Sequence, residues 1–180
     1  PKSNGQICIC GDYKVTVNQA VEIPPYPLPN TEDLFATLAG GTHFSKLDLA
    51  HAYNQLELDD DSKEYLTIST HLGLFRYNRL PFGVSSSPAI FQSVIDRIIQ
   101  GLDGVVCRAD DVLVTGVSEK DHLGHLEKVL GRFTDHTVRL NKDKCSFMED
   151  HVLCTVLKVA LPEHMVTLAG SHGTPRGTKM

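Results

Sequence analysis

The 180-residue chain lacks an overall positive charge, a long apolar run and any visible internal repeat. Its net charge is -5 at pH 7, so affinity for nucleic acid cannot be inferred from global charge and needs a local basic patch. Arg76 and Arg79 supply one, because no carboxylate occurs between Glu64 and Asp96. No stretch approaches the roughly 20 consecutive apolar residues of a membrane-spanning helix, so we expect no membrane association.

The chain also lacks paired cysteines. Its five cysteines include no C-x-x-C pair and their number is odd, so the sequence predicts neither a zinc ribbon nor a disulfide framework. Such cysteine usage is typical of reducing compartments, and we expect an intracellular protein, without a choice between cytoplasm and nucleus. The sequence starts at Pro1 rather than at a methionine, and we interpret it as a fragment of a longer protein.

The first 50 residues predict a strand, a connector, a helix and a second strand. Residues 7–17 mix β-branched and polar residues, which favours a strand interrupted by a turn. Residues 24–29 are rich in proline and cannot form a helix. A helix is expected from Asn30, whose side chain can cap it, to the glycine pair 40–41. Residues 44–49 then predict a short strand.

The clearest helix and a β-hairpin follow in the second half. Apolar residues repeat at helical spacing after Ser87, which we expect to be the N-cap, and Gly101 ends the helix. Two β-rich runs, residues 105–107 and 112–115, flank the acidic pair 110–111. The sequence therefore predicts a hairpin with acids at its tip.

A further helix is expected from Ser118, which forms a capping box with Asp121. His122 and His125 lie on this helix, but a third metal ligand is lacking and an apolar stripe already explains the helix, so we interpret them as structural. Residues 161–180 show little periodicity and are predicted to be a disordered tail. The stripe expected to face the core consists of Leu123, Leu126, Leu130 and Phe133.

Three aspartates have the arrangement that phosphoryl-transfer chemistry requires. Nucleotidyl transfer uses two divalent ions about 3.5–4 Å apart, and magnesium prefers hard oxygen ligands. Asp48 at a strand end and Asp110 and Asp111 on a neighbouring hairpin tip would bring carboxylates to one point. The alternative is that an Asp-Asp pair is a solvated turn. We interpret residues 59–61, also all aspartate, as such a solvated loop.

Five segments resemble, in the same order, the motifs of reverse transcriptases from gypsy-type LTR retrotransposons. They extend over residues 1–150, and each motif alone is moderately specific. The segments are the first fingers strand (10–18), the first catalytic motif (44–53), the second motif (73–92), the Tyr-x-Asp-Asp hairpin (108–111) and the segment after it (140–147). Five matches in family order make a chance resemblance improbable.

The resemblance implies an α+β fold, namely a right-hand polymerase palm whose antiparallel sheet is backed by helices, with partial fingers. The fingers would comprise about 1–42 and 54–83, and the palm about 43–53 and 84–160. The implied function is RNA-directed DNA polymerase, which uses a nucleic-acid template and primer, dNTPs and two Mg²⁺ ions, with Mn²⁺ as a substitute. Ribonuclease H and integrase regions are expected in the parent polyprotein.

The resemblance also implies roles for individual residues. Asp48 and Asp110 would hold both metal ions, with Asp111 as a supporting ligand. Lys144 would lie near the leaving pyrophosphate as a general acid, although a solvated lysine is the alternative. Tyr53 would exclude a 2'-hydroxyl beneath the sugar, the alternative being a core tyrosine. The residues expected to line the nucleotide pocket are Leu49, Phe82 and Gly83.

Three departures from the family pattern bear on activity. Cys8 stands where the family has an arginine that clamps the triphosphate, and a thiol cannot replace a bidentate cation. Arg108 replaces the tyrosine of the hairpin motif and adds a cation beside the acids. Residues 152–159 lack the glycine of the primer-gripping hairpin. The alternative function is therefore a catalytically silent relic or a recruited binding module, and we expect weak or no activity.

Overall fold

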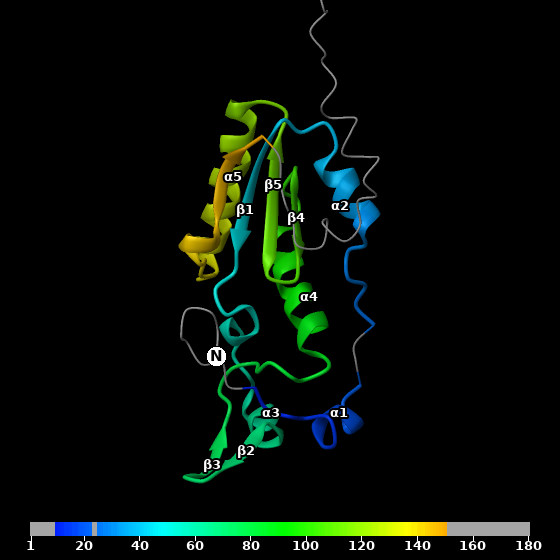
Figure 1. Ribbon diagram of the computed structural model, residues 1–180, viewed down its shortest axis with the longest axis vertical. Coiled ribbons are helices and arrows are strands. Elements are labelled where there is room, and N and C mark those ends of the chain that lie inside the picture. Colours follow the sequence, from blue (N-terminus) through cyan, green and yellow to red (C-terminus); the bar gives the residue numbers. More distant parts are fainter. Residues whose placement is uncertain (1–9, 23–24, 151–180) are drawn as a thin grey trace, which may run out of the picture.

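The computed structural model describes residues 10–22 and 25–150 of the chain. A four-stranded sheet with its helices occupies one end of the elongated molecule, and a small two-stranded hairpin occupies the other (Figure 1). The elements are α1 (Val17–Ala20), α2 (Thr31–Leu38), β1 (His43–Asp48), η1 (Ala52–Gln55), α3 (Asp60–Tyr65), β2 (Thr67–Thr70), β3 (Gly73–Arg76), α4 (Ser87–Ile99), β4 (Val105–Arg108), β5 (Asp111–Gly116), α5 (Glu119–Asp135), η2 (Lys142–Lys144) and β6 (Ser146–Glu149).

The larger sheet has the strand order β4-β5-β1-β6 and is antiparallel throughout. β1 and β5 pair along their whole lengths, from His43 opposite Gly116 to Asp48 opposite Asp111. β6 pairs with the other edge of β1, and its register shifts between Phe44 and Lys46. The strands expected near residues 44–49, 105–107 and 112–115 are confirmed, as is the hairpin that joins the last two.

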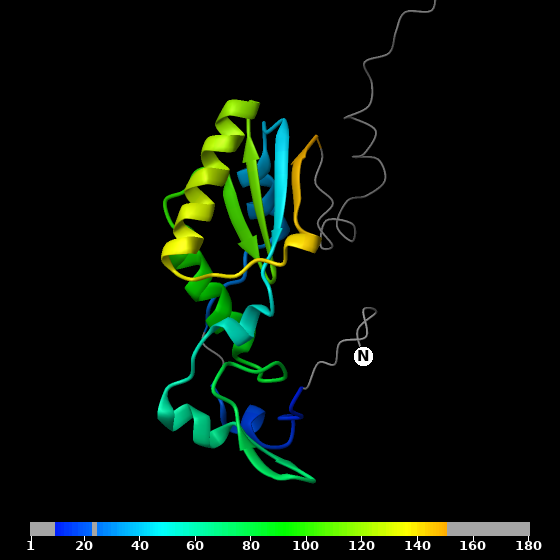
Figure 2. The same ribbon diagram turned by 90° about the vertical axis from the view of Figure 1, so that its left-hand side faces the viewer.

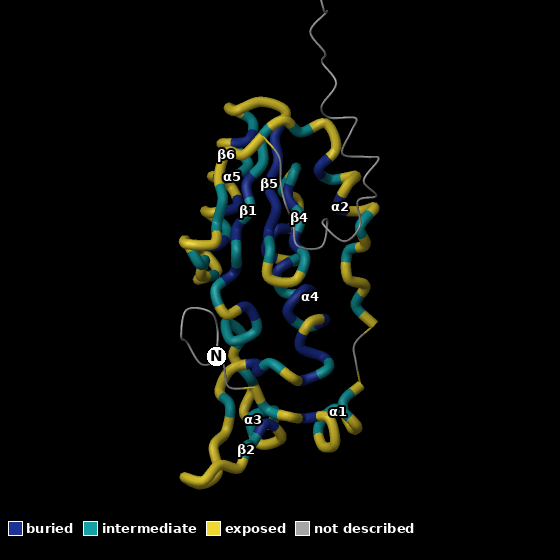
Figure 3. The backbone as a smooth tube through the Cα atoms, viewed as in Figure 1, coloured by how far each residue is buried: buried dark blue, intermediate teal, exposed yellow. Residues whose placement is uncertain are grey.

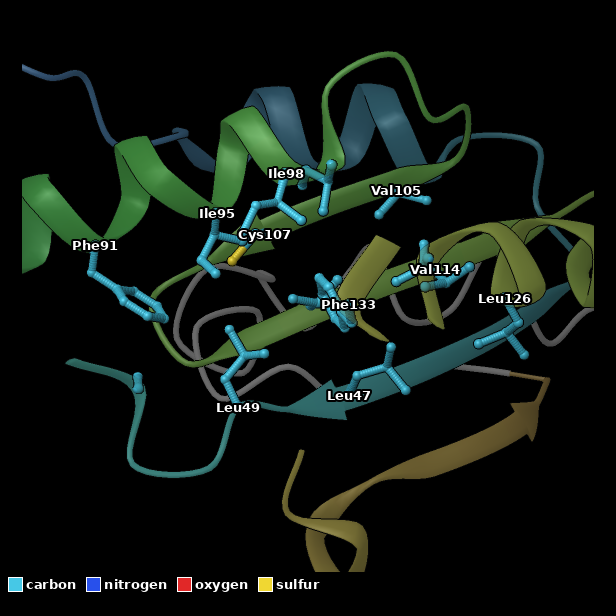
Figure 4. Close-up of a cluster of buried hydrophobic side chains, with 14 residues drawn as sticks. Leu47, Leu49, Phe91, Ile95, Ile98, Val105, Cys107, Val114, Leu126 and Phe133 are labelled. Carbon is cyan, nitrogen blue, oxygen red and sulfur yellow. The ribbon is translucent and has the colours of Figure 1, made fainter. Parts of the chain in front are cut away.

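The sheet carries its main core on one face. Leu47 and Val114 project from the sheet into a cluster of 14 buried residues that includes Phe91 of α4 and Phe133 of α5 (Figure 4). Figure 2 shows α5 running along this face. On the opposite face a second, smaller cluster joins residues of the sheet to α2. The expected α+β architecture, a sheet backed by helices, is confirmed.

A second region contains the shorter elements. We call residues 30–53 and 84–150 the sheet region, and residues 10–22 and 54–83 the hairpin region. In the hairpin region β2 and β3 form a separate two-stranded sheet, and all four residues of β3 are exposed (Figure 3). A small cluster of Tyr13, Leu66 and Val84 is buried where the two regions meet. This cluster of three buried residues is much smaller than the 14-residue core of the sheet region.

The strand expected at residues 7–17 is wrong over its described part, residues 10–17. The Asp12 carboxylate accepts a hydrogen bond from the Lys14 amide at 3.1 Å, and the Tyr13 carbonyl accepts from Thr16 and Asn18. These local bonds turn the chain into the short helix α1 instead of leaving its amides for a ladder.

Two expectations about helix starts are also wrong. Ser87 is not the N-cap of α4 but its first residue, and its buried hydroxyl donates to the Pro81 carbonyl at 3.0 Å. Residues 59–61 are not a loop: Asp59 caps α3 by accepting from the Ser62 amide at 2.7 Å, and the next two aspartates form its first turn. Acids are stabilised there by the helix dipole. The hydrogen bonds from Ser62 lower the pKa of the Asp59 carboxyl.

The buried stripe of α5 differs from the expected one at two of its four positions. Leu123 and Leu130 are 49% and 38% exposed, so two of the four expected core residues face solvent. The capping box is incomplete, because Ser118 caps the Asp121 amide while the Asp121 carboxylate accepts from Val117. The residues that face the sheet are His122, Leu126, Val129 and Phe133. These positions repeat at helical spacing, and the polar His122 can be buried among them because Ser45 Oγ lies 2.7 Å from its Nε2.

Several expectations concern residues outside the described ones. They include the disordered tail at 161–180, the altered primer-gripping segment at 152–159 and Cys8. Within the described residues, no helix combines the length and the apolar character needed to cross a membrane.

Candidate active site

The three predicted aspartates lie at one end of the sheet. Asp48 ends β1, and Asp111 begins β5 directly opposite it. Asp110 lies in the two-residue turn between β4 and β5, where Ala109 has a φ of 54°. The backbone of this turn is tied to β1, because the Leu49 amide donates to the Asp110 carbonyl at 2.8 Å. The end of β1 and the tight β4–β5 turn therefore bring the three aspartates together.

Gln92 of α4 holds the turn in place, and the sequence analysis did not select it. Its side chain is 1% exposed and donates to the Cys107 carbonyl at 2.8 Å. Its side-chain oxygen accepts from the Ala109 amide at 3.2 Å. Both bonds supply partners to the backbone of a turn whose first residue has a positive φ, a conformation that costs a non-glycine residue energy. A glutamine on the buried face of an otherwise apolar helix is the signal that identifies it.

Asp48 and Asp110 line a common pocket of about 360 Å³. The segment after β1 and the segment around η2 form its walls, together with Phe82 from the hairpin region. The lining residues are Asp48, Leu49, Ala50, His51, Ala52, Phe82, Asp110, Leu140, Asn141, Lys142, Asp143 and Lys144. The predicted site residues Asp48, Asp110, Lys144, Leu49 and Phe82 are thus neighbours.

The segment that carries Lys144 is attached to the end of β1. The Asn141 amide donates to the Asp48 carbonyl at 2.8 Å, and the Asp48 amide donates to Cys145 Sγ at 3.4 Å. Lys144 Nζ lies 3.7 Å from Asp48 Oδ2, and its side chain is 64% exposed. Lys144 is therefore both near the carboxylate and free to move toward a ligand in the pocket.

Tyr53 is half-buried beside the pocket. Its ring centroid lies 4.8 Å from that of Phe82 and 5.5 Å from that of Phe91, the latter in an edge-on arrangement. Burial raises the pKa of the Tyr53 hydroxyl, and the negative charge of Asp110 raises it further. Tyr53 thus packs against the core through Phe91 and against the pocket wall through Phe82. The first contact is what a core tyrosine would make, and the second is what a residue beneath the sugar of a nucleotide would make.

Gly83 is fixed by a close approach of the N-terminal segment. Its φ is 99°, and a Cβ atom built on it would collide with the Gly11 carbonyl oxygen. Asn18 binds the same stretch twice, donating to the Gly83 carbonyl at 2.9 Å and accepting from the Ser85 amide at 2.8 Å. A side chain at residue 83 would therefore separate two segments that both belong to the recognised motifs.

Asp111 differs from the other two aspartates in its surroundings. Its carboxylate lies 2.8 Å from Lys46 Nζ, and the two side chains are 15% and 19% exposed. Within the described residues, no group of three or more histidine, cysteine, aspartate or glutamate side chains is arranged to hold a metal ion. Arg108, which stands opposite Asp111 on β4, has a buried Nη1 atom that makes no hydrogen bond.

The remaining candidate residues take structural positions. His122 is fully buried with Nε2 2.7 Å from Ser45 Oγ, and His125 Nδ1 lies 2.7 Å from the Thr115 carbonyl. Arg79 pairs with Glu57 at 2.9 Å, and both side chains are largely exposed. Arg76, at the end of β3, is exposed as well.

Comparison with known proteins identifies the class of the fold and then the family. A structure of the foamy viral protease-reverse transcriptase in complex with double-stranded DNA superimposes with a TM-score of 0.78 and 22% identity, over 84% of this chain and 27% of that one. The chain therefore has a reverse-transcriptase fold, with a polymerase palm. The family described as "Reverse transcriptase (RNA-dependent DNA polymerase)" matches residues 6–165, and the chain belongs to this family.

Relatives with higher identity place the chain among transposon proteins. An uncharacterised protein of Caenorhabditis elegans is 37% identical over 152 residues, and the transposon Tf2-3 polyprotein of Schizosaccharomyces pombe is 35% identical over 154 residues. Each alignment covers 84% of this chain but 12% of the relative. The resemblance to gypsy-type retrotransposons is confirmed, and the chain spans about an eighth of the length of these relatives.

Proposed function

We propose that this chain is the core of an RNA-directed DNA polymerase that extends a primer on a nucleic-acid template with dNTPs. The observation that carries the proposal is the common pocket shared by Asp48, which ends β1, and Asp110, which lies in the turn between β4 and β5 of the same sheet. Family membership and the polymerase palm support the same reaction class. Because the chain spans 12% of its relatives, the rest of such a polyprotein would supply the remaining contacts to template and primer.

The donor atoms in the pocket fit divalent ions. Magnesium binds through one or two carboxylates and completes its shell with water and substrate phosphates, and Asp48 and Asp110 provide two carboxylates facing one space. Asp111 lies opposite Asp48 on β5, where its negative charge would support the site while its carboxylate is paired with Lys46. A bound pair of ions would supply activation of the primer hydroxyl and charge neutralisation at the phosphates, while the protein holds the geometry.

The residues around the acids fit specific tasks in this reaction. Phe82 and Tyr53 form a packed aromatic pair at the pocket wall, which would support the base and sugar of a nucleotide and oppose a 2'-hydroxyl. Lys144 is exposed and close to Asp48, so its ammonium group would reach a departing pyrophosphate and donate a proton to it. Gly83 allows the N-terminal segment to close over this wall.

A primer-extension assay with a magnesium titration tests the proposal. We expect Asp110→Asn to remove extension, because it deletes a carboxylate from the pocket. Asp103→Asn is the matched control, since Asp103 is an exposed aspartate in the turn before β4. The chain is assayed fused to an intact thumb domain, so that the duplex stays bound. Equal extension by the Asp110→Asn and Asp103→Asn proteins would contradict the assignment.

A catalytically silent binding module is the second candidate, and Arg108 favours it. This cation stands opposite Asp111 where the family has tyrosine, and one of its nitrogen atoms is buried without a hydrogen bond. The unaltered fusion is expected to extend a primer poorly. The double variant Cys8→Arg and Arg108→Tyr should raise extension above either single change, because both act on one ternary complex. Equal activity of the unaltered fusion and the double variant would show that the chain is a working polymerase core.

A further inference from the structure

We propose that Lys46 is a positioning residue that holds Asp111 away from the divalent-ion pocket and thereby sets how much metal the site requires. The proposal rests on the proposed function and adds a residue that the recognised roles leave unassigned. Lys46 Nζ lies 2.8 Å from the Asp111 carboxylate. Asp48 and Asp110, in contrast, both line the pocket.

Strand geometry explains why Lys46 reaches Asp111 in particular. Side chains alternate along a strand, so Lys46 and Asp48 lie on the same face of β1 while Leu47 is buried on the other. Asp111 is directly opposite Asp48 across the β1–β5 ladder. The diagonal neighbour of Asp111 on that face is therefore Lys46, and diagonal pairs are within reach of a long side chain.

The ion pair of Lys46 and Asp111 matters because three negatively charged carboxylates lie close together at this end of the sheet. Like charges directly opposite one another in an antiparallel pair are destabilising, and Asp48 faces Asp111 in that way. Lys46 offsets the repulsion while the metal ions are absent. Both partners of the pair are less than one-fifth exposed, so solvent screens their interaction less than it would at the surface.

Neutralising Lys46 should therefore have two effects of opposite sign. Without metal, Asp111 loses the Lys46 ammonium group beside Asp48, and the melting temperature should fall. With metal, Lys46 no longer holds Asp111 and the local net charge becomes more negative by one. We expect the Mn²⁺ concentration for half-saturation to fall roughly tenfold.

The test uses the full chain with Mn²⁺ as the probe. The variants are Lys46→Met, Lys46→Gln and Lys46→Arg, with Lys63→Met as the matched control. Lys63 forms an ion pair of similar length, 2.7 Å, with Asp60 in α3 of the hairpin region, away from the pocket. Water-proton relaxation reports both the Mn²⁺ affinity and the number of water molecules on the bound ion. Thermal unfolding in EDTA reports the stability of the metal-free protein.

The expected result is specific to a positioning role. Lys46→Met and Lys46→Gln should bind Mn²⁺ more tightly and remove one water from the bound ion, because Asp111 replaces it. Lys46→Arg should resemble the unaltered chain, as should the control. An unchanged affinity and water number in both neutral variants would overturn the proposal. Failure of both to fold, while the arginine variant folds, would also overturn it, by showing that the pair serves the sheet alone.

The same titration separates this proposal from the assignment on which it rests. Asp48→Asn and Asp110→Asn, each introduced into the chain with Lys46 in place, should each abolish Mn²⁺ binding. If they do not, the divalent-ion pocket itself is wrong. If they do, and the Lys46 variants still behave like the unaltered chain, only the role of Lys46 is wrong.

Discussion

The sheet region and the hairpin region are held together to very different extents. The sheet region contains a cluster of 14 buried residues between the strands and the helices α4 and α5. The hairpin region shares a cluster of three buried residues with the sheet region, which contributes Val84, and Leu72 and Leu74 at the hairpin tip are about three-quarters exposed. Regions with few buried apolar contacts open at lower free-energy cost.

The sheet region supplies the acids of the candidate site, and the hairpin region supplies part of the wall expected to contact the nucleotide. Asp48 and Asp111 lie on paired strands whose other face is buried, and the Asp110 carbonyl is bonded to the Leu49 amide, so the sheet fixes where the acids lie. Phe82 and Gly83 come from the end of the hairpin region, where the structure has fewer contacts to hold it. We infer that the carboxylates are pre-organised and that the nucleotide-lining wall is the adaptable part.

Removing a ring from the core of the sheet region should have the largest effect on stability. Phe133 is 2% exposed, and Phe133→Ala should lower the free energy of unfolding by about 3–5 kcal/mol. Leu130→Ala is the control on the same helix, where 38% of the residue is exposed. Urea unfolding followed by circular dichroism measures both. A loss below about 1 kcal/mol for Phe133→Ala would contradict a single dominant core.

A smaller effect, confined to the hairpin region, is expected from Gly83→Ala. The new methyl group would meet the Gly11 carbonyl and force a positive φ on alanine, which costs about 1–3 kcal/mol. Hydrogen exchange should show faster opening of residues 10–22 while the sheet region stays protected. Gly124→Ala on α5 meets nothing within 4 Å and should instead stabilise by about 0.5–1 kcal/mol. If both substitutions changed the free energy of unfolding in the same direction, the steric explanation for Gly83 would be wrong.

A pH-dependent weakening of the sheet region is expected from His122. Burial lowers the pKa of this imidazole, and the neighbouring charge of His43 lowers it further. The unfolded chain therefore binds a proton at a higher pH than the folded chain does. Stability should fall as pH drops below the ordinary histidine pKa of about 6.5, and it should level off below the folded pKa.

The melting temperature at a series of pH values between 7 and 5 measures this slope. His122→Gln keeps an acceptor for the Ser45 hydroxyl and should flatten the slope, whereas His71→Gln, at an exposed turn, should leave it unchanged. The same slope in both variants would assign the pH dependence to other groups.

Sequence reasoning succeeded where one local pattern determines the structure. Local residue patterns located β1, β4, β5 and α4, and the order of the motifs identified the family. It failed where a polar side chain bonds across the fold. His122 faces the core because Ser45 supplies a partner from a strand 77 positions away in the sequence, and no spacing in α5 reveals this. The pairing of Lys46 with Asp111 also depends on strand register, which the sequence does not fix.

The smallest effect should come from the exposed apolar residues of the β2–β3 hairpin, and it sharpens the comparison most directly. Leu74 is 74% exposed, so Leu74→Thr removes little buried area and keeps a residue suited to a strand. The free energy of unfolding should change by no more than about 0.5 kcal/mol. Leu66→Thr is the control, because Leu66 is 5% exposed in the same region and its loss opens the small cluster around Tyr13. If Leu74→Thr cost as much as Leu66→Thr, Leu74 would be buried in solution by contacts outside this fold. The hairpin region would then owe part of its stability to association rather than to its own core.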